Sequence, residues 1–253
     1  MMQELSVVII TLNEERNIAR CIESVKGLAS EVVVVDSLST DRTKAIAESM
    51  GARVVEQAFL GHIEQKNFAL KQARHSITLS LDADEALEDE LRSAVRAVLA
   101  RFDKDGYVMN RRTNFCGKWI RHGGWYPDAK LRLFRKGAGE WTGTNPHDRF
   151  ELHAGRKQGK LKGDILHYSF YSVEEHLAQI EKFSGISARA KFEEGVRSTW
   201  LKIGVKTAAK FIKGYIFKLG ILDGYYGWVI AKNSAYATYL RYYKLLQLQS
   251  EKE

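Results

Sequence analysis

Residues 77–85 read ITLSLDADE, an apolar strand that runs directly into the carboxylates of Asp82 and Asp84. Residues two apart in a strand point the same way, so both carboxylates can face one hard cation, and Ala83 leaves room for a ligand. Carboxylate oxygens suit Mg²⁺ and Mn²⁺, ions that often bind together with substrate phosphates. The motif therefore predicts metal-assisted chemistry on a phosphorylated substrate. An acidic turn before a helix would give the same sequence, and the rest of the chain must distinguish the two.

Similar apolar runs alternate with helical patterns over the first hundred residues. The runs LSVVIIT at 5–11 and EVVVVD at 31–36 have the β-branched composition of strands buried on both faces. Apolar residues at helical spacing follow each run, and we expect a further strand at 52–57 and helices at 63–74 and 87–100. This alternation predicts an α/β fold built on an open, mostly parallel sheet with helices on both faces.

Polar segments follow three of these strands, at residues 11–14, 36–41 and 82–84. Ligands of such sheets bind outside the carboxyl ends of the strands, so the three segments are expected to converge on one crevice. Their convergence favours the metal and phosphate interpretation. The chain lacks GxGxxG after its first strand, GxxxxGK[ST] and GxSxG. These absences argue against a dinucleotide-dependent oxidoreductase, a P-loop NTPase and a serine hydrolase.

Charge is distributed unevenly along the 253 residues, whose net charge is +8. The balance is −5 over residues 1–103, +9 over 104–162 and +4 over 163–253. We expect an anionic partner for the second half: nucleic acid, phospholipid or a phosphorylated sugar. Trp119, Trp125 and Trp141 lie among the basic residues of the middle segment, where they could stack on bases or sugars or simply fill a small core.

The compartment is predicted to be reducing and cytoplasmic. Cys21 and Cys116 are the only cysteines, and their spacing suits neither a metal site nor a disulfide framework. The amino terminus lacks the basic leader of a signal peptide, and no uncharged apolar stretch reaches the roughly 18 residues that span a bilayer. The sequence is also compatible with a protein that binds to the surface of a membrane.

Residues 196–222, VRSTWLKIGVKTAAKFIKGYIFKLGIL, show the strongest amphipathic pattern, with six basic residues and no acidic ones. Lys202, Lys206, Lys210 and Lys213 share one face of a helix, with aromatic and aliphatic residues opposite. This pattern is typical of a helix that lies on anionic lipid. A helix packed on its own domain with a solvated lysine face is the alternative. A second amphipathic helix is expected at 224–248.

The segments SVVIITLNEERNIARCIESV, VVVVDSLSTDRT, GHIEQKNFAL and LSLDADE together resemble the opening of family 2 glycosyltransferases with the GT-A fold. Later stretches, WYPDAKLRLFRKG, TNPHDRF and ILDGYYGW, look like the lipopolysaccharide core β-1,4-glucosyltransferases of the WaaE or KdtX type. The resemblance implies an inverting enzyme that uses Mg²⁺ or Mn²⁺ and moves glucose from UDP-glucose onto an inner-core heptose. It also implies a UDP-sugar donor, a lipid-anchored saccharide acceptor, the cytoplasmic face of the inner membrane and no nucleic-acid partner.

The resemblance also assigns roles to residues of the donor side. Asp82 and Asp84 match the family's DXD motif, in which the last Asp binds the metal and the first commonly contacts ribose. Residues implied to hold the nucleotide sugar are Thr11, Asn13, Glu14, Asp36, Ser37, Asp41, Lys66, Asp82, Ala83 and Arg132. Asp41 can equally cap the helix that follows it. Lys66 can equally be a surface lysine, and Arg132 and Arg135 can equally be solvated strand residues.

The resemblance implies one carboxylate base that takes a proton from the acceptor hydroxyl. Asp148, in TNPHD, stands where relatives have an acidic pair, and Asp128, in WYPDAK, is the alternative. We expect residues 1–103 to form the nucleotide-sugar-binding half of the domain, 104–170 its acceptor-side half and 171–253 a helical extension. Two other functions stay open: transfer to a polyprenyl phosphate, and nucleic-acid binding without catalysis.

Overall fold

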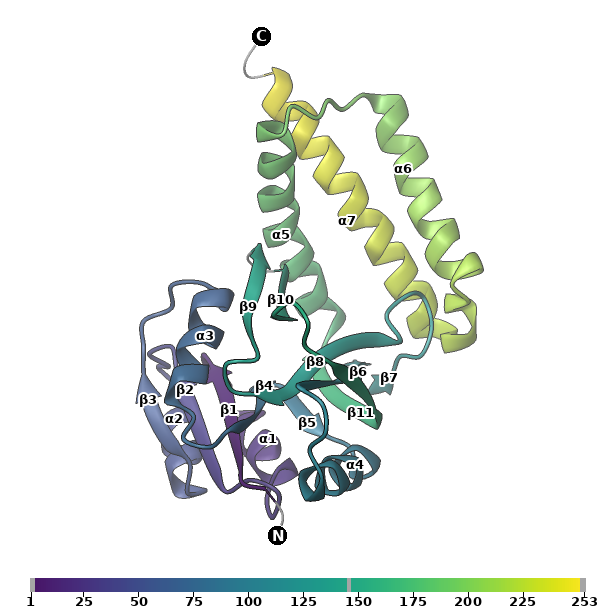
Figure 1. Cartoon of the computed structure of the whole chain (residues 1–253). Coiled ribbons are helices and arrows are strands. Elements are labelled where there is room, and N and C mark those ends of the chain that lie inside the picture. The colour runs from purple at the N-terminus through teal and green to yellow at the C-terminus, as the bar shows by residue number, and fades with distance from the viewer. Residues whose placement is uncertain (1–2, 145–146, 251–253) are drawn as a thin grey trace. The chain divides into compact units, whose positions relative to one another are not determined.

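The computed structural model of the chain describes residues 3–144 and 147–250 (Figure 1). It consists of two compact units. Unit 1 comprises Met1–Arg112 and Asp128–Tyr168, and unit 2 comprises Thr113–Pro127 and Ser169–Glu253. Every residue predicted to bind donor or metal, and both candidate bases, belong to unit 1.

Parallel strands form the first part of the sheet of unit 1, in the order β3-β2-β1-β4. Their bounds are β1 Leu5–Thr11, β2 Glu31–Asp36, β3 Arg53–Glu56 and β4 Ile77–Asp82. The helices that follow them are α1 Ile18–Ser24, α2 Thr43–Ser49, α3 His62–Gln72 and α4 Asp89–Ala100. The predicted parallel βα series is therefore confirmed.

Helices cover both faces of this sheet because successive strand residues point to opposite sides. Val7 and Ile9 pack in one apolar core with α1, α2 and α4. Val8 and Val35 pack in a separate core with α3. The unbroken apolar runs of the sequence thus fill two cores at once, and this leaves the polar strand ends as the accessible part of each strand.

Antiparallel strands extend the same sheet, which has nine strands within the described residues. They are β5 Glu85–Leu87, β6 Gly106–Phe115, β7 Lys118–Trp119, β8 Asp128–Arg135 and β11 Gln158–Phe170. The strand β5 was not predicted. It has three residues, begins one residue after Asp84, and pairs with β11 through the register His167↔Glu85. This pairing places Glu85, the residue directly after the acidic motif, inside the sheet.

A two-stranded sheet, β9 Gly139–Thr144 and β10 His147–Leu152, brings Asp148 to the site. It is held by an aromatic cluster in which the rings of Phe134 and Phe150 stack at 3.7 Å and Trp141 packs edge-on to Phe150. A Cβ at Gly139 would lie 2.1 Å from the carbonyl oxygen of Glu151, so this close approach requires glycine. Trp141 is buried in this cluster.

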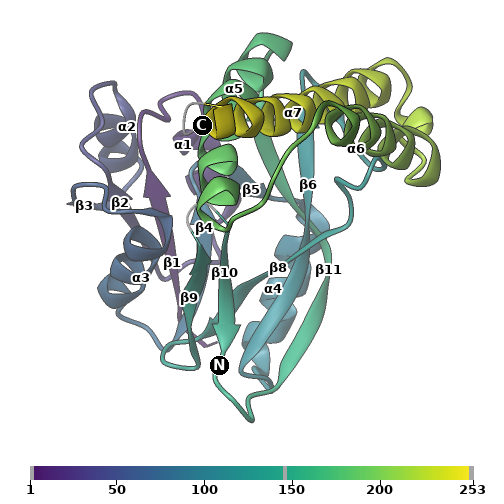
Figure 2. The same ribbon diagram turned by 90° about the horizontal axis from the view of Figure 1, so that it is seen from above.

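Unit 2 contains three long helices, and the last two form an antiparallel hairpin (Figure 2). They are α5 Val173–Glu193, α6 Trp200–Ile212 and α7 Gly224–Ser250. A π turn at Lys213–Phe217 and a 3₁₀ turn at Gly220–Asp223 join α6 to α7. None of the helices in the described ranges is long and apolar enough to cross a membrane.

The amphipathic segment predicted at 196–222 is not one continuous helix. It begins at Trp200, where the Thr199 hydroxyl accepts a hydrogen bond from the Lys202 amide, and its regular part ends at Ile212. Leu219 then adopts a left-handed conformation with φ +56°. Its apolar pattern continues through this turn, so spacing alone could not show the reversal. The helix predicted at 224–248 is confirmed as α7.

Candidate active site

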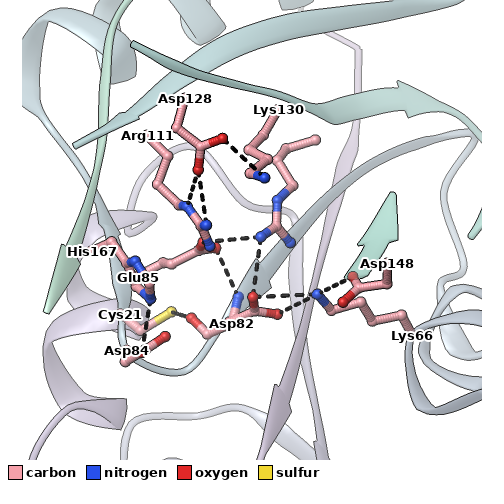
Figure 3. A network of polar contacts seen from close by, with 11 residues as sticks. Cys21, Lys66, Asp82, Asp84, Glu85, Arg111, Asp128, Lys130, Asp148 and His167 are labelled. Carbon is pink, nitrogen blue, oxygen red and sulfur yellow. Dashed lines mark hydrogen bonds and ion pairs between the residues drawn. The ribbon is translucent and has the colours of Figure 1, made fainter. Parts of the chain in front are cut away.

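Asp82 lies at the carboxyl end of β4, opposite Ile10 of β1, and is held between two cations (Figure 3). Lys66 Nζ is 3.0 Å from Oδ1 and Arg132 Nη2 is 3.1 Å from Oδ2. Burial alone would raise the pKa of Asp82, but the charges of Lys66 and Arg132 hold that pKa well below its usual value. Asp82 is therefore ionised and already neutralised by the protein.

Asp84, two residues on, has a different partner. Its Oδ2 lies 3.0 Å from Nε2 of His167, which β11 supplies. Burial raises the pKa of Asp84 and His167 lowers it, with a net lowering. His167 was not predicted, because the pairing of β11 with the three-residue strand β5, which leaves no pattern in the sequence, brings it here.

The donor set at this edge suits a divalent cation that arrives with its substrate. Within residues 3–144 and 147–250 no group of three or more His, Cys, Asp or Glu side chains is arranged to hold a metal alone. Mg²⁺ is commonly bound by one or two carboxylates, with substrate phosphates and water completing its shell. Asp84 fits that role, since ligating carboxylates are themselves usually hydrogen-bonded, as Asp84 is by His167.

Glu85 anchors the acidic motif from behind. Its side chain is fully buried, and Oε2 accepts a hydrogen bond of 3.0 Å from the Asp82 amide. Oε1 accepts hydrogen bonds from Arg111 Nη1 at 3.2 Å and Arg132 Nη2 at 2.9 Å. A fully buried carboxylate needs such partners, and these fix Arg132 beside Asp82. The only hint of this role in the sequence is its place as an acidic residue directly after the motif.

Arg132 has hydrogen-bonding capacity left over. Its side chain is 3% exposed, and its Nε and Nη1 are buried without a hydrogen-bond partner among the described residues. Burial would lower the pKa of Arg132, but the charges of Glu85 and Asp82 outweigh burial and raise it overall. The guanidinium therefore stays charged. An unsatisfied guanidinium edge beside Asp82 is suited to an oxyanion such as a phosphate. Arg135, by contrast, pairs with Ile77 at the opposite end of β4 and lies outside the site.

Asp148 is joined to the acidic motif through Lys66. Lys66 Nζ lies 2.7 Å from Asp148 Oδ2 and 4.5 Å from the centre of the Trp141 ring. The Lys66 side chain is 4% exposed, so the alternative prediction that Lys66 is a surface lysine is wrong. Residues 145 and 146 and the side chain of His147 lie outside the described part of the chain.

Asp128, the other candidate base, lies among different cations. Its Oδ2 is 2.9 Å from Arg111 Nη2, and its Oδ1 is 3.0 Å from Lys130 Nζ. The Asp128 side chain is 34% exposed, against 11% for Asp148. Both carboxylates border the network of Figure 3, but only Asp148 shares a cation with Asp82.

Of the residues predicted to hold the nucleotide, Thr11 ends β1 and Ser37 directly follows β2, and Gln65 of α3 lies beside Ser37. Thr11 Oγ1 and Gln65 Oε1 are buried without a hydrogen-bond partner in the described structure. Gln65 Nε2 donates to Ser37 Oγ at 3.0 Å. Buried polar atoms normally have partners, so orphaned ones at a sheet edge indicate a place for a polar ligand.

Other predicted contacts hold the loops together. Asn13, at φ +55°, accepts a hydrogen bond of 2.8 Å from the Thr40 amide, and Asp36 accepts one of 2.8 Å from the Ser39 amide. Asp41 accepts from the Thr43 amide at 2.9 Å, where α2 begins, as its capping alternative predicts. Burial raises the pKa of Asp41, but its hydrogen bonds from Thr43 lower it overall.

Glu14 lies partly buried at this edge, near other carboxylates. Burial raises its pKa to about 7, with further increases from Asp84 and Asp41, although a hydrogen bond from Asn17 opposes them. Cys21 donates a 3.6 Å hydrogen bond to the Asp82 carbonyl, and burial raises the pKa of this thiol, which makes it unreactive. A concentration of carboxylates favours a divalent cation.

Comparison with known proteins agrees with this arrangement. The model of the family described as glycosyl transferase family 2 matches residues 6–175, a range that contains all the site residues above. The chain belongs to glycosyl transferase family 2. It is therefore an enzyme that transfers a sugar from a nucleotide-sugar donor to an acceptor.

Glycosyltransferases of two bacteria match along almost the whole chain. An uncharacterized glycosyltransferase of Rickettsia bellii is 32% identical over 97% of this chain and 87% of its own length. The lipopolysaccharide core biosynthesis glycosyltransferase LpsC of Rhizobium meliloti is 30% identical over 96% of this chain and 92% of its own length. A crystal structure of S. aureus TarS 1–349 superposes with a TM-score of 0.50 at 17% identity, covering 99% of this chain and 92% of that one. This likeness confirms the predicted fold class.

Proposed function

We propose that this glycosyltransferase is an inverting, metal-dependent enzyme that moves glucose from UDP-glucose onto a heptose of the lipopolysaccharide inner core. One observation carries the proposal: Asp82 ends β4 against Lys66 and Arg132, Asp148 binds the same lysine, and Asp84 lies two residues on against His167. The 30% identity to a relative named for lipopolysaccharide core biosynthesis supports the acceptor class, as does the resemblance to WaaE or KdtX type enzymes.

On the donor side, Asp84 would hold Mg²⁺ or Mn²⁺, with His167 fixing its carboxylate. Bound there, the ion would offset negative charge on the diphosphate as the glycosidic bond breaks. Arg132 would bind the diphosphate with the two nitrogens that lack hydrogen-bond partners. Thr11 and Gln65 would meet polar groups of the nucleoside through their orphaned oxygens, and Ala83 would leave space for the sugar.

On the acceptor side, Asp148 would act as the base. Its carboxylate takes the proton of the acceptor hydroxyl as that oxygen bonds to the anomeric carbon, from the face opposite the diphosphate. The bond from the anomeric carbon to the diphosphate oxygen breaks, and its electron pair leaves with UDP. Lys66 would position Asp148, since it contacts Asp148 and Asp82 together. No covalent sugar intermediate is required, and the anomeric configuration inverts.

The acceptor of this reaction would be anchored in lipid, so the enzyme would work at the cytoplasmic face of the inner membrane. Because the chain belongs to a family of enzymes, we no longer propose a nucleic-acid-binding protein without catalysis. Polyprenyl phosphate stays as the competing acceptor, and the activity of an Asp148→Asn variant distinguishes the two, because an acceptor that is already ionised needs no base.

The direct test is transfer of labelled glucose from UDP-glucose to purified inner-core acceptor with and without Mn²⁺. We expect metal-dependent transfer, with inversion visible in the NMR coupling constant of the new linkage. Asp84→Ala should abolish it while Asp89→Ala should not, because Asp89 is an exposed residue of α4. Full activity of Asp84→Ala would refute the metal assignment, and use of another sugar nucleotide alone would refute the donor.

A further inference from the structure

Helix α6 exposes an apolar stripe. Leu201, Val205 and Ile212 lie four and seven positions apart, which places them on one face of the helix, and Ile216 follows four positions later in the π turn. Their exposed fractions are 79%, 57%, 43% and 55%. Ile203, on another face, is 3% exposed. The helix therefore packs through a different face and leaves its larger apolar one in contact with solvent.

The turn that joins α6 to α7 is also apolar and exposed. We call it the hairpin tip, and its exposed apolar side chains are Ile216, Phe217, Leu219, Ile221, Leu222 and Tyr225. Phe217 is 76% exposed and Tyr225 69%. Clusters of this kind on a protein surface mark contact with another protein or with a membrane.

A cavity of about 310 Å³ lies beside the tip, and we call it the lysine pocket. Lys210, Lys213 and Lys218 line it together with Gly123, Gly124, Trp125 and other small or apolar residues, without an acidic one. The Gly123 amide donates a 2.8 Å hydrogen bond to the Lys218 carbonyl, which ties this wall to the tip. All of these residues belong to unit 2.

The lysines of this pocket have no counter-ion among the residues that the structure describes. In the described ranges no carboxylate lies within ion-pair distance of Lys210, Lys213 or Lys218. The carboxylate nearest in sequence, Asp223, is buried and accepts hydrogen bonds from the amides of Arg121 and His122. A pocket lined by three lysines and by no acidic residue has the charge of a phosphate site.

We propose that the hairpin of α6 and α7 docks on an anionic phospholipid bilayer, with the tip in the headgroup and acyl boundary and the lysine pocket around a lipid phosphate. Residues 196–222 carry six basic side chains and no acidic one, which complements an anionic surface. Tyr225 and Trp228, both exposed, are the residue types that favour the membrane interface.

A second copy of the chain is a poorer occupant of this surface. A two-fold interface would bring the same patch of each copy together and would gather the lysines of both copies in one interface. Like charges so placed repel, and no acidic residue within 196–222 could compensate them. Lipid satisfies both the apolar stripe and the lysines.

The role of this docking rests on the proposed function, because docking would bring the enzyme to a lipid-anchored acceptor. Its test needs neither sugar donor nor acceptor. Failure of vesicle binding and failure of sugar transfer are therefore separate results.

The test is co-sedimentation of the full chain with vesicles of phosphatidylcholine alone or of phosphatidylcholine with phosphatidylglycerol. We expect binding to the anionic vesicles only, weakened by salt. The triple variant of Lys210→Gln, Lys213→Gln and Lys218→Gln should bind about 10²-fold more weakly. The matched control removes the same charge at three exposed lysines elsewhere, Lys160→Gln, Lys162→Gln and Lys182→Gln, and should bind nearly as the wild type does.

The tip has its own pair of variants. Phe217→Ser with Leu222→Ser should also reduce binding, whereas Phe59→Ser with Leu60→Ser, exposed in unit 1, should not. Absence of binding to anionic vesicles, or equal loss in the pocket and control variants, would overturn the proposal. Vesicle-free self-association that the tip variant abolishes would instead assign this face to a second copy. Inorganic phosphate that stabilises the chain without any vesicle binding would reduce the pocket to a site for free phosphate.

Discussion

The acidic edge of unit 1 and the hairpin of unit 2 treat charge in opposite ways. At the edge, Asp82, Glu85 and Asp148 each face a lysine or arginine of the same unit. On the hairpin, Lys210 and Lys213 line a pocket without an acidic residue. Burying an unpaired charge is costly, so the enclosed edge carries its own counter-ions, while the open hairpin can wait for a partner from outside.

This difference explains what each region is suited to do. The edge is preorganised: its charges are fixed by several contacts, so a charged donor can replace internal partners without a large rearrangement. The hairpin is suited to binding another surface, because its charges and exposed apolar side chains gain partners only when it meets one. Variants that remove a charge should therefore have large effects at the edge and small effects on the isolated protein at the hairpin.

The largest effect is expected at Asp148. Asp148→Asn should lower kcat on a hydroxyl acceptor by roughly 10² to 10⁴-fold, the usual contribution of a general base. Asp128→Asn, the matched control, should lower it far less. The measurement is steady-state transfer with saturating donor. A larger loss in Asp128→Asn would exchange the two roles, and an active Asp148→Asn would favour an acceptor that is already ionised, such as a polyprenyl phosphate.

The contrast in stability comes next. Arg132→Met should lower the free energy of unfolding by about 3 kcal/mol, because Glu85 and Asp82 lose a buried partner. Lys213→Met removes an exposed, unpaired charge and should change it by no more than about 0.5 kcal/mol. Urea unfolding measures both. Equal changes would mean that the edge is not preorganised by charge pairing.

The smallest expected effect is on the pH dependence of stability. Glu14 in unit 1 and His176 in unit 2 should change stability in opposite directions as pH rises. The pKa of Glu14 is raised to about 7, so the folded state binds more protons and stability falls as pH rises from about 4.5 to 7. Burial lowers the pKa of His176 to about 4, so the unfolded state binds more protons and stability rises as pH rises from about 4 to 6.5.

Single variants should separate these two slopes. Glu14→Gln should leave stability rising between about pH 4.5 and 6.5, and His176→Gln should leave it falling. Urea unfolding at several pH values provides the check. The same slope in both variants would mean that neither group has the shifted pKa.

Sequence reasoning predicted the parts of the fold that local patterns encode. The β-branched runs of β1 and β2 and the periodic helices were found because each pattern lies within one segment. The three-residue strand β5 was missed, and with it Glu85 and His167, since a short strand becomes visible only through its pairing with β11. The link from Lys66 to Asp148 spans 82 positions, and no spacing rule predicts it.

The hairpin shows the converse limit. Amphipathic spacing through residues 196–222 correctly marked an apolar and basic surface. It also continued across the turn at Leu219, and so predicted one helix where α6 is followed by a π turn and a 3₁₀ turn. Gly227 explains the turn, because a Cβ there would lie 1.8 Å from the Gly220 carbonyl oxygen. Such close backbone contact depends on three-dimensional packing.

The most direct test of the proposed metal and donor site measures UDP binding to the wild type and to Asp84→Asn by thermal unfolding. Each protein is unfolded with UDP, in the presence and in the absence of Mn²⁺. Asn keeps the size of Asp and can still contact His167, so the variant removes mainly the charge. We predict that UDP at about 100 times its Kd stabilises the wild type by about 2.7 kcal/mol only when Mn²⁺ is present, and that Asp84→Asn loses this effect. Equal stabilisation of both proteins by UDP, with no dependence on Mn²⁺, would contradict the account.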